Sequence, residues 1–223
     1  MISVDSQYAT TLASNDRQVN TVPALYASSG KRLFDVIVAV LVIVFVLTWL
    51  VPLISVAICA TSRGPAFFIQ ARTGRKGRPF RCFKFRTMTH QPKSSDEFRQ
   101  TSANDSRVTW VGGFLRKTNL DEMPQFINVL FGDMSIVGPR PHAVQHDAQF
   151  WNMPGYTERY MIKPGITGVA QVRGCRGETA QLIDMQHRVR LDHWYIGRYS
   201  FLLDCKICWW TVEKMWKGDK KAF

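Results

Sequence analysis

The sequence lacks the short motifs that mark several large classes of nucleotide-using enzymes. Its 223 residues contain no Walker phosphate loop, no Gly-x-Gly-x-x-Gly stretch and no Gly-x-Ser-x-Gly elbow. They also contain no Asp-x-Asp pair of the sort that holds a metal-bound nucleotide sugar. These absences argue against a P-loop NTPase, a dinucleotide-dependent dehydrogenase and an α/β-hydrolase.

Acidic residues and cysteines are also scarce. The chain has 17 acidic side chains against 29 lysines and arginines, which gives a net charge of +12. Such a basic protein favours anionic partners: nucleic acid, acidic lipid or a phosphorylated substrate. Its five cysteines are an odd number in a chain that is not small. This count argues against a secreted disulfide scaffold and favours a reduced, cytosol-facing location.

Charge is absent altogether from the 27 residues that run from Val36 to Ser62. An uncharged apolar run of about 18 residues or more indicates a membrane segment. The apolar core of a signal peptide is shorter, about 7–15 residues, and lies nearer the N-terminus. The residues before the run, 1–30, are rich in Ser, Thr, Ala and Asn, so we expect them to form a disordered tail.

The course of the apolar run depends on Pro52 and on the charges at its two ends. Proline interrupts a helix, and the arm before Pro52 reaches only about 24 Å, short of a bilayer core of about 30 Å. Lys31 and Arg32 precede the run, and a series of basic residues begins at Arg63. Basic flanks prefer the cytoplasmic side. We therefore favour a re-entrant helix over 31–62, with a kinked spanning helix as the alternative.

The remainder, 63–223, is predicted to form a cytoplasmic catalytic domain with interfacial helices. Two short strands around the turn at 74–77 indicate a β-hairpin, and Lys84 and Arg86 share one face of its second strand. Residues 90–107 are polar and are expected to form a loop. A helix is expected at about 121–131, followed by a turn and a further short strand.

The C-terminal segment has apolar residues at helical spacing, which predicts an amphipathic helix. The apolar positions are Phe201, Leu202, Cys205, Cys208, Trp209, Val212, Met215 and Trp216. Such a face suits either a membrane interface or the protein's own core. The single Cys205-x-x-Cys208 pair is interpreted as filling within this face, because a zinc site needs further ligands.

One pair of adjacent acids, Asp121 and Glu122, is a candidate catalytic site. Arg116 and Lys117 precede it, so cations lie nearby in the sequence. A carboxylate with a fixed position and neighbouring cations can act as a nucleophile or hold a metal ion. The alternative is that the pair only caps the N-terminus of the following helix.

Basic residues near Gly/Pro turns are candidates for phosphate binding. Arg140 lies between Pro139 and Pro141, where a stiff backbone lowers the cost of bidentate binding. Lys84 and Arg86 are further candidates. The alternative for these residues is a solvated surface or contact with lipid headgroups. His142 and His146 have no third ligand at a matching spacing and are interpreted as structural or peripheral.

Several ordered blocks carry a resemblance to a known family. They are KRxxD at 31–35, GPAFF at 64–68, KFRTM at 84–88, LRKTNLDEMPQ at 115–125, GDMSIVGPRP at 132–141 and KPGITG at 163–168. In this order they resemble the bacterial sugar transferase family, the monotopic polyprenyl-phosphate phosphoglycosyl transferases. The resemblance extends from about Lys31 to Lys217. One departure is Val51 before Pro52, where the family often has serine, so proline alone has to bend the helix.

The resemblance implies a reaction and a set of roles. Members of the family move a sugar-1-phosphate from a nucleotide diphosphate sugar to a polyprenyl phosphate and release the nucleoside monophosphate. By this resemblance Asp121 is the nucleophile and Glu122 binds Mg²⁺. Arg116 and Arg140 match the family's arginines and are expected, with Lys84 and Arg86, to bind substrate. The fold implied is α+β and mostly helical, with a re-entrant helix, a short β-hairpin and an amphipathic C-terminal helix.

The resemblance also implies the substrates and the location. The stretch VRGCRGET at 172–179 is similar to members that transfer glucose-1-phosphate from UDP-glucose to undecaprenyl phosphate in exopolysaccharide synthesis; galactose is the alternative. The expected location is the cytoplasmic face of the bacterial inner membrane, with membrane lipid as a partner. A homodimer is left open. Nucleic acid is not an expected partner, although a membrane-tethered nucleic-acid-binding protein remains a rival because aromatic residues interleave with the basic ones.

Overall fold

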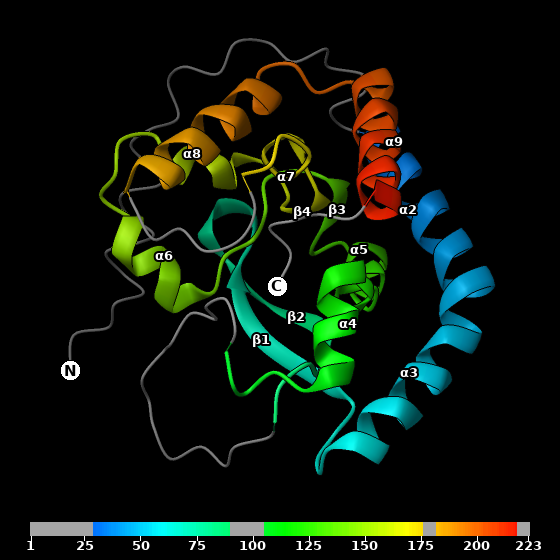
Figure 1. The fold of residues 1–223 in the computed structure, drawn as a ribbon. Coiled ribbons are helices and arrows are strands. Elements are labelled where there is room, and N and C mark those ends of the chain that lie inside the picture. The colour runs from blue at the N-terminus through cyan, green and yellow to red at the C-terminus, as the bar shows by residue number, and fades with distance from the viewer. Residues whose placement is uncertain (1–28, 90–104, 176–181, 218–223) are drawn as a thin grey trace.

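The structure, a computed structural model, describes residues 29–89, 105–175 and 182–217. Helices surround two small two-stranded sheets, so the fold is α+β and mostly helical, as the sequence predicted. One long helix runs along one side of the globular part (Figure 1). Most of the expected tail and most of the expected polar loop lie outside the described residues.

The long helix consists of α2 (Lys31–Val42), a π-helical turn (Ile43–Leu47) and α3 (Thr48–Thr61). It is long and apolar enough to cross a membrane, and most of its apolar stretch is not buried in the molecule. Pro52 lies inside α3 and the chain stays helical past it, so the expected turn at Pro52 is not observed. The irregularity lies earlier, where the N–H of Thr48 bonds to the carbonyl of Ile43. Such wide turns bend helices, and the long helix curves around the domain (Figure 1).

The N-terminal end of the long helix is bound to distant parts of the chain. Lys31 Nζ donates hydrogen bonds to Asp204 Oδ2 in α9 (Phe201–Lys217) at 2.6 Å and to the Tyr195 hydroxyl in α8 (Leu182–Ile196) at 3.0 Å. Asp35 Oδ1 accepts hydrogen bonds from the Ser135 hydroxyl and the Ile136 N–H, both at 2.9 Å. These buried polar contacts fix where the helix begins on the domain.

The C-terminal end of the long helix is bound to the same domain. Arg86 donates from its two Nη atoms to the carbonyls of Ser62 and Arg63, at 2.7 and 2.9 Å. The outer face between the two ends is apolar and exposed; it carries Leu41, Val44, Phe45, Trp49, Leu53 and Val56. The inner face packs Leu50, Ile54 and Ile58 against a second core that also contains Phe85, Val111 and Leu115.

The predicted hairpin is confirmed. β1 (Phe67–Thr73) and β2 (Pro79–Phe85) are antiparallel, and their register runs from Phe67 opposite Phe85 to Thr73 opposite Pro79. Alternation along β2 buries Phe85 completely under α3. The preceding residue, Lys84, is thereby directed to the other face of the hairpin.

Two short helices with a tight turn between them follow the hairpin. They are α4 (Trp110–Thr118), a 3₁₀ turn (Leu120–Glu122) and α5 (Gln125–Phe131). The expected helix over 121–131 is therefore wrong at its start. Asn119 adopts the left-handed conformation, with φ of 61°, and ends α4. Pro124 precedes the first residue of α5, where a residue without an N–H costs no hydrogen bond.

The second sheet lies next to the main core. β3 (Ser135–Val137) and β4 (Gly165–Thr167) are parallel, and β4 is the short strand expected in this region. The backbones touch at two glycines: a Cβ on Gly165 would lie 2.1 Å from the nitrogen of Gly138. Around the sheet lie α6 (Val144–Phe150), a 3₁₀ segment (Thr157–Met161) and α7 (Val169–Val172).

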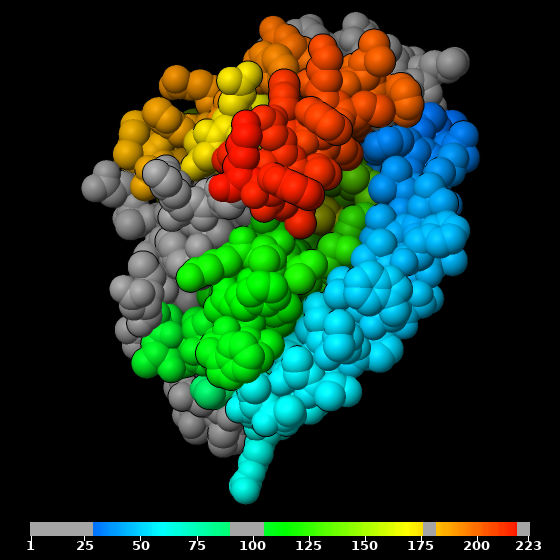
Figure 2. All heavy atoms as spheres, turned by 45° about the vertical axis from the view of Figure 1, so that its right-hand side comes forward, coloured from blue at the N-terminus to red at the C-terminus, as the bar shows by residue number. Residues whose placement is uncertain are grey.

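The C-terminal helix α9 is amphipathic, as predicted. Its inner side buries Asp204 and Ile207 completely, whereas Leu202, Trp209 and Trp216 are exposed. Cys205 and Cys208 are free thiols. Figure 2 shows α9 (red), α2 and α3 (blue to cyan) and the α4 region (green) on one face of the molecule. We call the exposed apolar side chains of these helices, which include Trp110 and Phe114 of α4, the apolar surface.

Candidate active site

The acid pair lies in the 3₁₀ turn between α4 and α5. The left-handed Asn119 reverses the chain at this point, so Asp121 and Glu122 are carried into the molecule rather than out to solvent. Both are buried, with exposed fractions of 8% and 6%. Burial of two adjacent carboxylates is costly unless cations accompany them.

Two cations bind the acid pair directly. Lys84 Nζ, from β2, lies 2.7 Å from Glu122 Oε1 and 3.9 Å from Asp121 Oδ2. Arg140, from the segment after β3, binds Glu122 with both terminal nitrogens: Nη1 donates to Oε2 at 2.9 Å and Nη2 donates to Oε1. Glu122 thus takes the close contacts, while the longer contact with Lys84 leaves the Asp121 carboxylate less tightly held.

The structure places the two other predicted substrate-binding arginines differently. Arg116 lies in the last turn of α4, where its Nε donates to the Thr87 hydroxyl at 2.9 Å and its charge acts on Asp121. Arg86 has both Nη atoms on the end of α3. Lys84, Arg116 and Arg140 therefore surround the acid pair, whereas the Arg86 guanidinium binds the C-terminal end of the long helix.

Burial dominates the electrostatics of the site. It raises the pKa of Asp121 above its usual value, against the opposing effects of Lys84, Arg140 and Arg116. Burial also lowers the pKa of Lys84, although the charge of Glu122 opposes this. Burial also opposes the charge of Arg140, but the charges of Glu122 and Asp121 and the hydrogen bonds to Glu122 together outweigh it, so the pKa of Arg140 is raised and it remains charged. Three cations around two carboxylates leave an excess of one positive charge, which favours an incoming anion.

A second layer of buried polar residues supports Arg140. Arg159, which is 1% exposed, donates from Nη2 to the Arg140 carbonyl at 2.9 Å. Its Nε donates to Asp192 Oδ2 of α8 at 2.7 Å. His142 lies 3.2 Å from Arg159 Nη1 and 2.7 Å from the Tyr156 hydroxyl, so this histidine is packed in the interior and is structural rather than peripheral.

Sequence reasoning missed Arg159 and Asp192. The two are 33 positions apart and belong to no local motif. One signal was present in α8, whose buried stripe contains Met185, Val189 and Ile196. Asp192 falls on this apolar stripe at helical spacing, and a charge in such a position indicates a buried ion pair.

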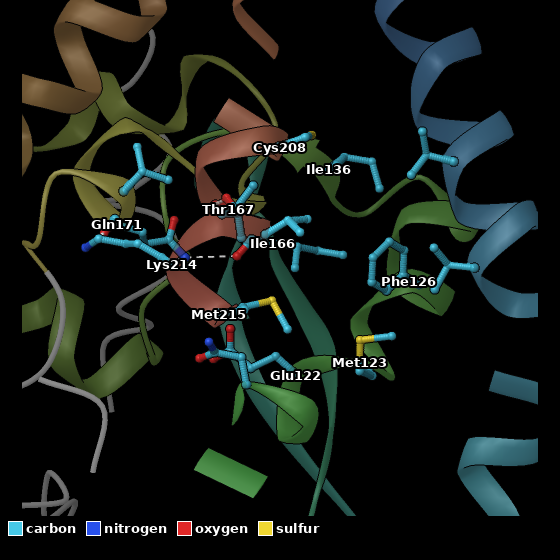
Figure 3. A pocket seen from close by; sticks show the side chains of 16 residues that line it. Glu122, Met123, Phe126, Ile136, Ile166, Thr167, Gln171, Cys208, Lys214 and Met215 are labelled. Atoms are coloured by element: carbon cyan, nitrogen blue, oxygen red, sulfur yellow. Dashed lines mark hydrogen bonds between the residues drawn. The ribbon is translucent and has the colours of Figure 1, made fainter. Parts of the chain in front are cut away.

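A cavity of about 280 Å³ borders the acid pair (Figure 3). Most of its lining is apolar and comes from α2, α5, the β3–β4 sheet and α9. Glu122 is the member of the acid pair that lines it. Within the described part of the chain, no three His, Cys, Asp or Glu side chains gather as a metal site.

Known proteins are similar to this sequence over most of its length. It is 45% identical over 213 residues to the UDP-glucose:undecaprenyl-phosphate glucose-1-phosphate transferase of Klebsiella pneumoniae, covering 91% of this chain and 45% of that protein. Proteins of the same name from Escherichia coli K12 and Caulobacter vibrioides are 47% and 42% identical, with 82% and 89% of this chain covered. The alignments cover 39% of the former protein and 74% of the latter. The chain thus spans less than half the length of two of these relatives.

A family model described as "Bacterial sugar transferase" matches residues 26–218. The matched range includes the long helix, the hairpin, the acid pair with its three cations, and α9. Every element that builds the site therefore lies within the shared region. The chain belongs to the bacterial sugar transferase family.

Proposed function

We propose that this chain transfers glucose-1-phosphate from UDP-glucose to undecaprenyl phosphate and releases UMP. The observation that carries the proposal is the buried Asp121–Glu122 pair among Lys84, Arg116 and Arg140. Family membership supports the class of reaction, and the names of the relatives support the donor and the acceptor. The product is the first lipid-linked sugar of a polysaccharide.

In the first step, a carboxylate oxygen of Asp121 attacks the phosphorus of the glucose-1-phosphate unit. A bond forms between this oxygen and phosphorus, and the diphosphate P–O bond breaks. The electron pair of the broken bond leaves on UMP. No proton has to move, because the nucleophile is a carboxylate and the leaving group is a phosphate. Lys84 and Arg140 stabilise the charge that gathers on the phosphoryl oxygens.

In the second step, a phosphate oxygen of undecaprenyl phosphate attacks the same phosphorus. The bond to Asp121 breaks and the carboxylate is restored, so the enzyme returns to its starting state. A covalent intermediate divides one difficult transfer into two easier ones. It also allows a water-soluble donor and a lipid acceptor to use the same cations in turn.

We further propose that Glu122 binds Mg²⁺. The donor chemistry fits, because Mg²⁺ in such sites takes one or two carboxylates and completes its shell with substrate phosphates and water. Glu122 is both a carboxylate and part of the cavity lining. When bound, the ion supplies charge that offsets the repulsion between the two phosphate substrates. Lys84 and Arg140 already bind this carboxylate, so they would share it with the ion.

The contacts at both ends of the long helix support a location on one side of the membrane. A spanning helix would place its two ends on opposite sides of a bilayer core of about 30 Å, so a single globular domain could not contact both. Here Lys31 contacts α9 and Ser62 contacts Arg86, so both ends stay on one globular domain. We propose that the helix enters the inner membrane from the cytoplasm without crossing it, and that the apolar surface faces lipid.

The nucleotide product tests the proposed function. Purified protein is mixed with vesicles that contain undecaprenyl phosphate. Mg²⁺ and UDP-glucose, labelled in the sugar, are added in solution. The expected products are UMP and a labelled diphosphate lipid, and chelation of divalent cations is expected to stop both. Release of UDP would indicate an ordinary glycosyltransferase instead. Turnover with UDP-galactose alone would indicate the other sugar. Binding of nucleic acid without turnover would overturn the proposal.

A further inference from the structure

The cavity beside the acid pair has the properties of a site for an amphiphile. Its walls are formed by apolar side chains, including Val38 of α2, Phe126 of α5, Ile136, Ile166 and Val212 of α9. Its volume of about 280 Å³ lies below the range of about 300–1,000 Å³ that encloses a whole drug-sized ligand. The cavity therefore suits one segment of a longer apolar molecule.

The polar groups of the cavity lie together. In Figure 3, Glu122 and Lys214 lie at one side of the cavity, and Phe126 lies at the opposite side. Glu122 connects the cavity to Lys84 and Arg140, which bind its carboxylate. Lys214 Nζ donates to the Gln171 carbonyl at 3.2 Å. Lys214 is the cation that lines the cavity itself, and Lys84 and Arg140 lie behind the Glu122 carboxylate. A phosphate at this end would therefore lie near all three cations, while a chain attached to it would meet mainly apolar walls.

The walls of the cavity also belong to the helices of the apolar surface. Val38 and Val42 come from α2, and Val212 and Met215 come from α9. Val212 is 58% exposed, so the cavity lining continues to the outside of the molecule at α9. An apolar chain that leaves the cavity between these helices would enter the layer of lipid proposed to cover them.

We propose that this cavity binds the first isoprene units of the polyprenyl phosphate acceptor, with the phosphate beside Glu122 and the remaining chain passing out between α2 and α9. The inference rests on the proposed function and adds the position of the lipid to it. It also assigns a role to Val42 and Val212, neither of which takes part in the chemistry.

Two substitutions that fill the cavity, each with a matched control, test the inference. Val42→Phe and Val212→Phe add bulk to the lining from two different helices. Leu41→Phe and Leu202→Phe add a ring on the same helices at exposed positions that do not line the cavity. Because Val212 is already half-exposed, its variant remains informative if Val42→Phe fails to fold.

The two half-reactions separate the outcomes. UMP release in a single turnover without lipid reports on the nucleotide sugar, and the KM for undecaprenyl phosphate reports on the acceptor. We expect both cavity variants to raise that KM at least about tenfold and to leave the UMP burst unchanged. The two control variants should behave as the wild type. The same relative loss is expected with a short polyprenyl phosphate of three isoprene units, because only the first units occupy the cavity.

Other results would overturn the inference. An unchanged KM for the acceptor in both cavity variants would show that the lipid binds elsewhere. A UMP burst that falls as much as the transfer would show that the cavity holds the nucleotide sugar. Absence of any UMP burst in the wild-type protein would instead refute the proposed function, so the two failures are distinguishable.

Discussion

The two adjacent carboxylates differ in what surrounds them. Glu122 is bound by Lys84 and by both terminal nitrogens of Arg140, which makes it an anchor for the cations. Asp121 has the longer contact of 3.9 Å with Lys84 and a pKa that burial raises. A carboxylate held close to cations without being bound tightly by them can still attack phosphorus. This difference supports the proposal that Asp121, rather than Glu122, is the nucleophile.

Replacement of Asp121 by Asn tests this assignment. The amide keeps the shape of the side chain but cannot form a stable acyl phosphate, so transfer and the UMP burst should both disappear. Glu213→Gln, a change at the surface of α9, serves as the control and should keep full activity. Radiolabelled sugar retained on denatured wild-type protein, and absent from Asp121→Asn, would mark the covalent bond. Turnover above about a tenth of the wild-type rate would exclude Asp121 as nucleophile.

The pKa directions at the site predict a bell-shaped pH profile for the UMP burst. Asp121 attacks only when ionised, and its pKa lies above the ordinary value of 3.8, so the acid limb should be centred above that value. Lys84 acts only when protonated, and its pKa lies below 10.5, so the basic limb should be centred below that value. Single-turnover rates across the pH range check both limbs. An acid limb at or below 3.8 would contradict the buried environment of Asp121.

The raised pKa of Asp121 also affects the stability of the folded protein. Because the folded-state pKa of Asp121 is raised, the folded protein binds this proton more tightly than the unfolded chain does. The ionised carboxylate therefore lowers the free energy of unfolding above the raised pKa, and that loss is recovered as the pH falls through it. It follows that Asp121→Asn should unfold no more easily than the wild type at neutral pH.

The role of Arg140 in the reaction is predicted to require its planar guanidinium as well as its positive charge. Arg140→Lys keeps the positive charge but loses the two-pronged contact with Glu122. We expect the barrier of the chemical step to rise by about 2–4 kcal/mol, by analogy with the loss of one oxyanion donor. Arg107→Lys alters a similar bidentate contact, with Asp105, outside the site and should leave the rate unchanged. Equal rates for Arg140→Lys and the wild type would leave Arg140 only a structural role.

At the scale of secondary-structure elements, short connections position the site. The 3₁₀ turn carries the acids, the end of β2 carries Lys84, and the segment after β3 carries Arg140. None of these elements is longer than seven residues, so their positions depend on what packs behind them. Arg159 provides such support by holding the carbonyl of Arg140 from inside the molecule.

The long helix is the element whose placement is easiest to test in cells. Ser29 and Thr61 are exposed and lie near its two ends. In a cysteine-free background, Ser29→Cys and Thr61→Cys should both resist an impermeant thiol reagent in intact cells and react after the membrane is opened. This outcome follows if both ends remain on the cytoplasmic side. Labelling of Ser29→Cys in intact cells, with Thr61→Cys protected, would mean that the helix spans the membrane.

At the scale of the whole molecule, the sequence predicted features that depend on local patterns or on sequence blocks in a fixed order. The hairpin follows from alternating residues around a turn, and the acid pair with Lys84, Arg116 and Arg140 follows from blocks in a fixed order. The start of α5 was missed because it depends on the backbone of a single residue, Asn119. The position of Arg86 was also beyond reach, since only tertiary structure brings the end of α3 to it.

Lys31 and Asp204 join the two ends of the described chain in one buried ion pair. Removing one partner of such a pair leaves a buried charge and costs about 3–5 kcal/mol. Asp204→Leu should therefore lower the free energy of unfolding by about this amount, as denaturant titration in detergent would measure. The double variant Lys31→Met with Asp204→Leu should recover much of the loss, because no charge is left without its partner. Asp184→Asn, at an exposed position in α8, is the control. A double variant no more stable than Asp204→Leu would contradict this account.

The same ion pair constrains how the protein is made. Lys31 and Asp204 are 173 positions apart, so at about 5–20 residues per second the ribosome adds Asp204 roughly 9–35 s after Lys31. During that interval the long helix has been made, while Asp204, the ion-pair partner of its first charged residue, does not yet exist. Completion of α9 supplies the last of the contacts at the start of this helix, so a nascent chain stalled before residue 204 would keep the contacts of Asp35 with Ser135 and Ile136 but lack the Lys31–Asp204 ion pair.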